Sequence, residues 1–189
     1  MKKIIWLFGQ PGAGRSTFIN SFNNDSNDTK KLLGVSSDNI SIIDFPYDRE
    51  NSSANYGYLN NRRISIYSDI KNFIDNDNEV IIINGEYVDY SDINNGIMKK
   101  IQTDFPDINK EILILNPSDL DELYNRMINT DWFKSDYQRN IHKYPKDWLN
   151  FAVNYMKKSL LEYEKIGYKV TEVDTLDGYS VTKKHKSFK

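Results

Sequence analysis

The chain has 189 residues, with 25 Lys and Arg against 27 Asp and Glu, two His and no Cys. A chain of this length favours a single domain with a sizeable core. The lack of Cys excludes a disulfide scaffold, a thiolate zinc site, an iron–sulfur site and a cysteine nucleophile, and two His are too few for a histidine-rich metal site. The balanced charge gives no global field for nucleic acid or an anionic membrane, although a local basic patch stays open.

Neither end of the chain predicts a membrane segment. The apolar run at residues 4–8 follows two lysines but is too short for the core of a signal peptide. No other stretch approaches the length of a membrane span, so we expect a soluble, cytoplasmic protein with no membrane partner. Residues 181–189 are basic, and we expect a solvated terminus there rather than a nucleic-acid arm. The expected organisation is one domain over residues 1–175 and a short basic tail over residues 176–189.

Five short apolar runs are typical of strands that are buried on both faces of a sheet. In chain order they are residues 4–8, 40–43, 80–83, 112–115 and 168–173. Helical spacing of apolar residues occurs between and after them, at residues 16–22, 61–74, 92–103, 118–128 and 145–166. This alternation predicts an α/β domain with a five-stranded parallel sheet, helices on both faces and a site outside the carboxyl ends of the strands.

Three connections have no regular pattern, at residues 23–38, 46–59 and 129–144. Long connections in a compact domain are usually functional lids or disordered segments. The segment 129–144 is the lid candidate.

The strongest feature of the chain is the sequence Gly9-Gln10-Pro11-Gly12-Ala13-Gly14-Arg15-Ser16-Thr17, which follows an apolar strand and precedes a helix. Small residues let backbone N–H groups turn toward phosphate oxygens, and the helix that follows directs its positive end at them. The spacing and the context indicate a phosphate-binding loop for ATP, the alternative being an ordinary glycine-rich turn. Ser16 stands where a hydroxyl would bind Mg²⁺ between the β- and γ-phosphates.

Two residues depart from the phosphate-loop pattern. Arg15 stands where the motif calls for Lys, and a planar guanidinium is not interchangeable with a compact ammonium at a tight phosphate site. The third strand ends in Asn84, where many proteins with this loop place an Asp for the Mg²⁺ shell. Glu86 is the candidate for that metal role. These departures keep a catalytically degenerate nucleotide-binding protein open beside an enzyme.

The residues 4–17, Ile-Ile-Trp-Leu-Phe-Gly-Gln-Pro-Gly-Ala-Gly-Arg-Ser-Thr, resemble the opening of small P-loop kinases, above all the adenylyl-sulfate kinases and their phage-type relatives. Residues 60–64, Asn-Asn-Arg-Arg-Ile, are similar to the Asn-Ile-Arg-Arg segment that starts a helix in adenylyl-sulfate kinases. The order of elements matches over residues 1–115, and the chain beyond Asn116 is more similar to nucleoside and nucleotide kinases. The resemblance implies a P-loop kinase fold, ATP and Mg²⁺ as cofactors, and a nucleotide-like acceptor, adenylyl sulfate at the level of the family.

The candidate acceptor site begins at Asp44, which directly follows the second strand. In the resembled kinases an Asp at this strand end contacts the acceptor hydroxyl, which implies a catalytic role for Asp44; a capping role is the alternative. Asp48 and Arg49 offer a second carboxylate and an acceptor-binding cation. By resemblance, Arg62 and Arg63 are candidates for binding an acceptor phosphate or sulfate, and a solvated helix start is the alternative.

A basic lid over the phosphates would exclude water from the reaction. Arg126 resembles the lid arginine that follows an Asn-Pro-Ser strand end in nucleotide kinases, and Arg139 and Lys134 are the alternatives. Aromatic residues near the lid candidate indicate either helix packing or a base-stacking surface. They are Trp132, Phe133, Tyr137, Tyr144 and Trp148.

The leading hypothesis is an ATP-dependent phosphotransferase in which Arg15 and Arg126 or Arg139 stabilise the transferred charge and Asp44 acts on the acceptor hydroxyl. The acceptor stays open among adenylyl sulfate, a nucleoside monophosphate, a nucleic-acid 5′ end and a hydroxymethylated base in DNA. A nucleotide-binding protein without turnover is the alternative from another class.

Overall fold

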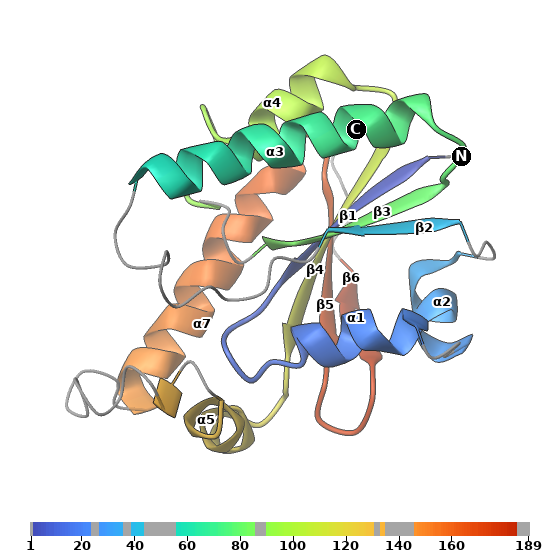
Figure 1. The fold of residues 1–189 in the computed structure, drawn as a ribbon. Helices are drawn as coiled ribbons and strands as arrows, with labels where there is room; N and C mark the ends of the chain where they lie inside the picture. Colours follow the sequence, from blue (N-terminus) through green and yellow to red (C-terminus); the bar gives the residue numbers. More distant parts are fainter. Residues whose placement is uncertain are drawn as a thin grey trace.

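The computed structural model describes residues 2–23, 27–35, 39–43, 56–85, 90–130, 133–134 and 146–184. Within these ranges it describes only the backbone of residues 22–23, 27–28, 56–63 and 183–184. One sheet runs through the molecule with helices on both of its faces (Figure 1). Within the described ranges, no helix combines the length and the hydropathy needed to cross a bilayer.

The sheet has six strands in the order β2-β3-β1-β4-β5-β6. They are β1 (Lys3–Phe8), β2 (Ile40–Ile43), β3 (Val80–Asn84), β4 (Asn109–Asn116), β5 (Lys169–Asp174) and β6 (Ser180–Lys184). The first five strands are parallel, and β6 is antiparallel to β5. The prediction of an α/β domain whose strands are mostly parallel is confirmed. The predicted number of five strands is wrong, because the sheet has six.

The sixth strand lies in the segment for which the sequence predicts a solvated basic tail. Residues 180–184 pair with β5, and Gly178, with φ +104°, lies in the turn between the two strands. The dipeptide Asp177-Gly178 is a hairpin signal, and the β-branched Val181 and Thr182 suit a strand. This pairing satisfies backbone groups along the outer edge of β5. Residues 185–189 lie outside the described residues.

The helices lie close to their predicted positions. They are α1 (Arg15–Asn23), α2 (Asn27–Leu33), α3 (Tyr56–Asp75), α4 (Ile97–Asp104), α5 (Leu120–Ile128) and α7 (Lys146–Leu161), with a 3₁₀ turn η2 (Glu162–Ile166) after α7. Helix α2 lies in a connection for which the sequence predicts no regular structure, because Leu33 is buried in the core and anchors this short segment. Helix α3 begins five residues before its predicted start at residue 61.

Two hydrophobic clusters cover the two faces of the sheet. Side chains alternate along β1, so Trp6 and Phe8 belong to a cluster with α3 and α4. Ile5 and Leu7 belong to the other cluster, with α1, α2 and α5. Figure 1 shows these two sets of helices on opposite sides of the sheet, and α7 contributes side chains to both clusters. Burial on both faces explains why the strands read as continuous apolar runs.

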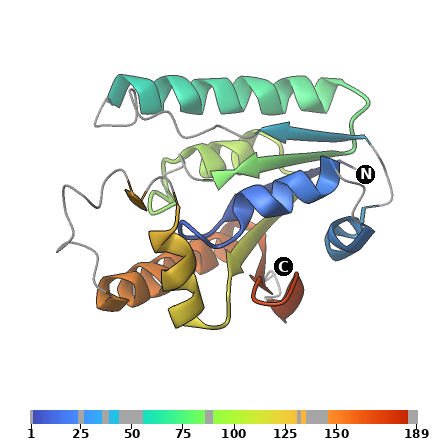
Figure 2. The ribbon, with the colours of Figure 1, turned by 60° about the horizontal axis from the view of Figure 1, so that its bottom comes forward.

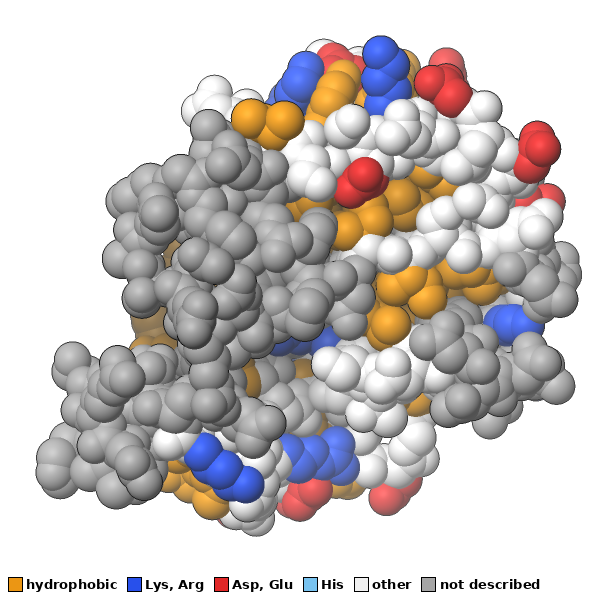
Figure 3. Space-filling view, in the orientation of Figure 1, with side chains coloured by type: hydrophobic (Ala, Val, Ile, Leu, Met, Phe, Trp, Pro, Cys, Tyr) orange, Lys and Arg blue, Asp and Glu red, His pale blue; other side chains and the backbone are white. Residues whose placement is uncertain are grey.

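On the face shown in Figure 3, the acidic and basic side chains of the described residues are interspersed rather than gathered by sign. This distribution agrees with the formal charge of −2 for the whole chain.

Candidate functional site

The candidate phosphate loop lies at the carboxyl end of β1, the strand between β3 and β4. The chain crosses from one side of β1 to the other when it passes from β3 to β4. Open α/β sheets bind ligands at such a switch point, outside the carboxyl ends of the strands. Residues 9–14 connect β1 to α1 at this edge, as both ribbon views show (Figures 1 and 2).

Two glycines give the loop its turn. Gly12 and Gly14 have φ of +84° and +92°, a region that L side chains rarely adopt. The amide of Ala13 donates to the carbonyl of Gln10 at 3.0 Å, and the amide of Phe18 donates to the carbonyl of Gly14 at 2.8 Å. The amides of the first turn of α1 therefore point along the helix axis toward the loop, which is the geometry that binds phosphate.

The loop also packs too closely against its neighbours to carry side chains at two positions. A Cβ on Gly9 would lie 2.7 Å from the carbonyl oxygen of Leu115, at the end of β4. A Cβ on Gly12 would lie 2.7 Å from the backbone nitrogen of Met127, in the last turn of α5. Because both contacts are with backbone atoms, neither can be relieved by a change of rotamer.

Hydrogen bonds connect the phosphate loop to the segment after β5 and, through that segment, to α5. Thr175 directly follows β5, and its buried hydroxyl donates to the carbonyl of Ala13 at 3.0 Å. The guanidinium of Arg126 donates to the carbonyls of Thr175 at 2.8 Å and Leu176 at 3.1 Å. Its Nε donates to the Glu122 carboxylate at 2.6 Å. The segment after β5 therefore contacts both the phosphate loop, through Thr175, and α5, through Arg126.

The two departures from the phosphate-loop pattern contact each other. Nη1 of Arg15, the first residue of α1, donates to Oδ1 of Asn84 at 3.0 Å. Asn84 is the last residue of β3 and is only 3% exposed. An amide oxygen accepts this charge-assisted hydrogen bond without cancelling the positive charge of the guanidinium. The contact therefore holds a cation at the first turn of α1.

Asp174 joins the ends of β4 and β5 beside the loop. Its Oδ1 accepts hydrogen bonds from the amides of Ser118 at 2.8 Å and Leu176 at 2.9 Å. Burial alone would raise the pKa of Asp174, but hydrogen bonds from Ser118, Leu176 and Thr175 outweigh burial and lower it. A cavity of about 220 Å³ opens here, between the ends of β4 and β5, with residues of β6 and α7 in its wall.

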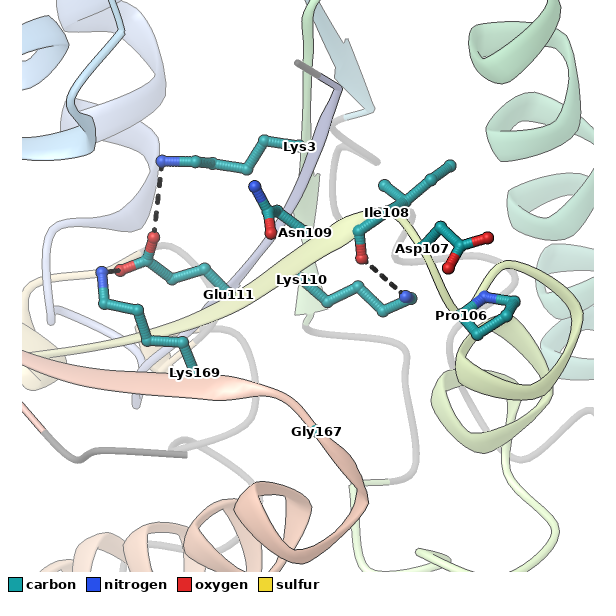
Figure 4. Close-up of a pocket in the computed structure, with 9 residues that line it drawn as sticks. All are labelled: Lys3, Pro106, Asp107, Ile108, Asn109, Lys110, Glu111, Gly167 and Lys169. Carbon is teal, nitrogen blue, oxygen red and sulfur yellow. Dashed lines mark hydrogen bonds and ion pairs between the residues drawn. The ribbon is translucent and has the colours of Figure 1, made fainter. Parts of the chain in front are cut away.

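A cavity of about 390 Å³ lies at the opposite edge of the sheet, where the strands begin (Figure 4). The Glu111 carboxylate in its wall lies 2.6 Å from Nζ of Lys169 and 3.7 Å from Nζ of Lys3. The Thr171 hydroxyl also donates to Glu111, at 2.9 Å. This side of the cavity is a compensated ion network that links β1, β4 and β5, which is a structural role.

We expect the stability of the protein to increase between pH 7.5 and 9.5 because of Lys110 in the same cavity wall. Burial lowers the pKa of Lys110 to about 8, although the Asp107 carboxylate opposes the shift. An unfolded Lys keeps its proton up to about pH 10.4. The unfolded chain therefore holds more protons between these two values, and the free energy of unfolding increases with pH across that window.

Urea unfolding at the two pH values measures this increase, and Lys110→Met should lack the contribution of Lys110. Nζ of Lys110 donates to the carbonyls of Phe105 at 2.5 Å and Ile108 at 2.7 Å, so the variant also loses these two hydrogen bonds at both pH values. Lys71→Met changes an exposed lysine of α3 and should keep the wild-type dependence. Equal pH dependence in Lys110→Met and wild type would contradict the prediction.

Several residues proposed from the sequence lie outside the described residues. They are Asp44, Asp48, Arg49, Glu86 and Arg139. Arg62 and Arg63 lie on α3, where the structure describes only the backbone. Ser16 and Thr17 are exposed in the first turn of α1, beside Arg15. The roles of all these residues stay predictions.

The lid candidate 129–144 is described only at residues 129–130 and 133–134. Within it, Phe133 is 3% exposed and belongs to the core cluster on the side of α1 and α5. Trp148 packs against the same cluster. These two aromatic side chains therefore serve helix packing, while Trp132, Tyr137 and Tyr144 lie outside the described residues.

The sequence offers little signal for the role of Thr175, since a single Thr after a strand belongs to no motif. No sequence pattern predicts the contact of Gln10 with α7 either, in which the side-chain amide of Gln10 lies 3.9 Å from Sδ of Met156. The position of Thr175 in the chain does indicate that it lies near the phosphate loop. Both follow parallel strands, and the carboxyl ends of parallel strands lie at the same edge of the sheet.

No protein-family model matches this chain, and no curated protein matches its sequence. Among solved structures, the crystal structure of APE1195 is similar with 16% identity and a TM-score of 0.45, over 85% of this chain and 96% of that chain. A deoxyadenosine kinase from M. mycoides, solved with the products dCMP and a flexible dCDP, is similar with 13% identity and a TM-score of 0.34, over 84% of this chain and 99% of that chain. Likeness this low does not carry either protein's ligands or activity over to this chain.

Proposed function

We propose that this protein is an ATP-dependent phosphotransferase that transfers the γ-phosphate to a hydroxyl of a nucleotide-like acceptor. The observation that supports the proposal is the glycine loop between the central strand and α1, with two left-handed glycines and the amino end of a helix facing the same space. Adenylyl sulfate is the finer proposal for the acceptor, and it rests on the resemblance of the sequence alone.

The described residues fit the phosphates of a nucleotide because the loop is kept clear of side chains where Gly9 and Gly12 approach backbone. For Mg²⁺, the exposed hydroxyl of Ser16 offers one ligand. No three side chains of His, Cys, Asp or Glu come together as a metal-binding group in the part of the chain that the structure describes. We propose that Ser16 and the nucleotide's own phosphates hold Mg²⁺, which would neutralise charge on the phosphate oxygens.

In the proposed reaction the acceptor hydroxyl attacks the γ-phosphorus, the bond from this phosphorus to the β–γ bridging oxygen breaks, and ADP leaves. Asp44 takes the proton of the hydroxyl. Arg15 stabilises charge on the phosphates. Because Arg126 already contacts Glu122 and two backbone carbonyls, we assign it to holding the loop and propose Arg139 as the lid cation.

Transfer from γ-labelled ATP to a panel of acceptors tests the proposal. The panel contains adenylyl sulfate, nucleoside monophosphates, DNA with a free 5′ hydroxyl and DNA with a hydroxymethylated base. Asp44→Asn should lower kcat by about 10²- to 10⁴-fold, because general-base catalysis contributes that much, and should keep ATP affinity. Asp75→Asn, an exposed carboxylate at the end of α3, is the matched control and should keep wild-type transfer.

The outcomes separate the two classes of function. Bound ATP without transfer to any acceptor would overturn the enzyme and favour a nucleotide-binding protein without turnover, for which the Arg15–Asn84 contact is the supporting observation. A nucleic-acid acceptor requires DNA binding that weakens steeply with salt. Absence of ATP binding would overturn both classes.

A further inference from the structure

We propose that Lys110 is a nucleophilic lysine that binds small aldehydes covalently, as an imine, in the cavity at the edge of the sheet where the strands begin. This cavity lies at the opposite edge from the phosphate loop. Imine formation at Lys110 is therefore independent of the proposed function, and either can fail without the other.

Lys110 is a nearly buried lysine without an ion pair. It lies near the start of β4, lines the cavity of about 390 Å³ and is only 5% exposed (Figure 4). Its neighbour Glu111 points to the other face of the sheet, where it pairs with Lys3 and Lys169. No carboxylate in the described part of the chain forms an ion pair with Lys110. Burial without such a partner disfavours the charged form of the side chain.

Two backbone carbonyls fix the position of the Lys110 amine. Nζ donates to the carbonyl of Phe105, directly after α4, at 2.5 Å and to the carbonyl of Ile108 at 2.7 Å. An ammonium group has three N–H donors, whereas a neutral amine has two and a lone pair. The two carbonyls therefore satisfy both donors of the neutral amine and leave its lone pair on the remaining side of the nitrogen.

Much of this amine is neutral under mildly basic conditions. Burial lowers the pKa of Lys110 to about 8, although the Asp107 carboxylate opposes the shift. Because an unperturbed lysine has a pKa of about 10.4, Lys110 holds about 100-fold more neutral amine at pH 8 than such a lysine does. Desolvated lysines of this kind are the ones that form imines with carbonyl compounds.

The surroundings of Nζ favour an aldehyde as the partner. The lone pair attacks the carbonyl carbon, both amine hydrogens leave with the aldehyde oxygen as water, and a C=N bond forms. The product is neutral, or cationic once it takes a proton from water, so the carbonyl oxygens of Phe105 and Ile108 do not repel it. Carbon dioxide would instead give an anionic carbamate beside these oxygens and the Asp107 carboxylate, which repel it.

Reductive labelling with glycolaldehyde and cyanoborohydride at pH 8, followed by peptide mass spectrometry, tests the proposal. Cyanoborohydride reduces an imine to a stable secondary amine, so the label marks the lysine that formed it. Lys110 should be labelled about tenfold faster than the exposed Lys71 of α3, because burial slows access and offsets part of the excess of neutral amine. In urea the two lysines should be labelled at similar rates, because unfolding removes the environment that lowers the pKa of Lys110.

Asp107→Asn separates a reactive amine from a merely structural one. Loss of this carboxylate lowers the pKa of Lys110 further and should speed its labelling at pH 7 about twofold. Asp75→Asn, at an exposed carboxylate of α3, is the matched control and should keep the wild-type rate. Lys110 labelled no faster than Lys71 in the folded protein, or no faster in Asp107→Asn than in wild type, would overturn the proposal. If Asp107→Asn fails to fold, the comparison of Lys110 with Lys71 in wild type decides the question.

Discussion

Gly12→Ala is expected to weaken ATP binding by about 100-fold, which corresponds to about 2.7 kcal/mol. An L residue in the left-handed region costs about 1–2 kcal/mol. The added Cβ would also lie 2.7 Å from the nitrogen of Met127 and 3.0 Å from Cβ of Arg126. Because Met127 contributes a backbone atom, the loop must move away from α5, and its amides then no longer face one phosphate group.

Gly34→Ala is the matched control for this prediction. Gly34 also has a positive φ, +62°, but a Cβ added to it would meet nothing within 4 Å, and it follows α2, away from the loop. The control variant should lose about 1 kcal/mol of stability through the backbone alone and keep wild-type ATP affinity. Calorimetric titration and urea unfolding measure both quantities. ATP affinity unchanged in Gly12→Ala would mean that the glycine loop does not bind the phosphates.

Arg126→Ala is expected to lower the free energy of unfolding by about 3 kcal/mol, since hydrogen bonds from a charged group contribute about 1.5–3 kcal/mol. The variant removes the bonds to Glu122, Thr175 and Leu176 together. Thr175→Val keeps the shape of the side chain and removes its bond to the carbonyl of Ala13, at a cost of about 1–3 kcal/mol for the unsatisfied group. Both variants should also weaken ATP binding, because they remove hydrogen bonds that fix the position of the phosphate loop relative to the segment after β5.

The double variant separates a holding role of Arg126 from a lid role. If Arg126 acts through Thr175, the two changes share one pathway and their effects on ATP affinity are less than additive. A lid arginine would instead lower kcat, leave stability unchanged and combine additively with Thr175→Val. Lys158→Ala, an exposed cation on α7, is the control for the loss of a positive charge. Additive effects of the two changes on ATP affinity, with no loss of stability in Arg126→Ala, would support a lid role for Arg126 instead.

The parallel strands and the phosphate loop are predictable from the chain because their signals are local. Strands buried on both faces must be apolar throughout, as residues 4–8 and 80–83 are, and a loop that bends around phosphate needs its glycines at fixed intervals. Strand β6 is different. Its five residues are polar and basic except for Val181, and they form a strand because β5 offers an unpaired edge next to the Asp177-Gly178 turn.

The partners of the loop depend on how distant segments meet. Arg15 and Asn84 are 69 residues apart, and Ala13 and Thr175 are 162 residues apart. No local pattern encodes such contacts; they arise because β3, β1 and β5 are parallel and their carboxyl ends share one edge of the sheet. From the sequence alone, Arg15 in place of Lys and Asn84 in place of Asp are two unrelated departures from the phosphate-loop pattern. Strand order makes them a single hydrogen-bonded pair, because it sets the end of β3 beside the start of α1.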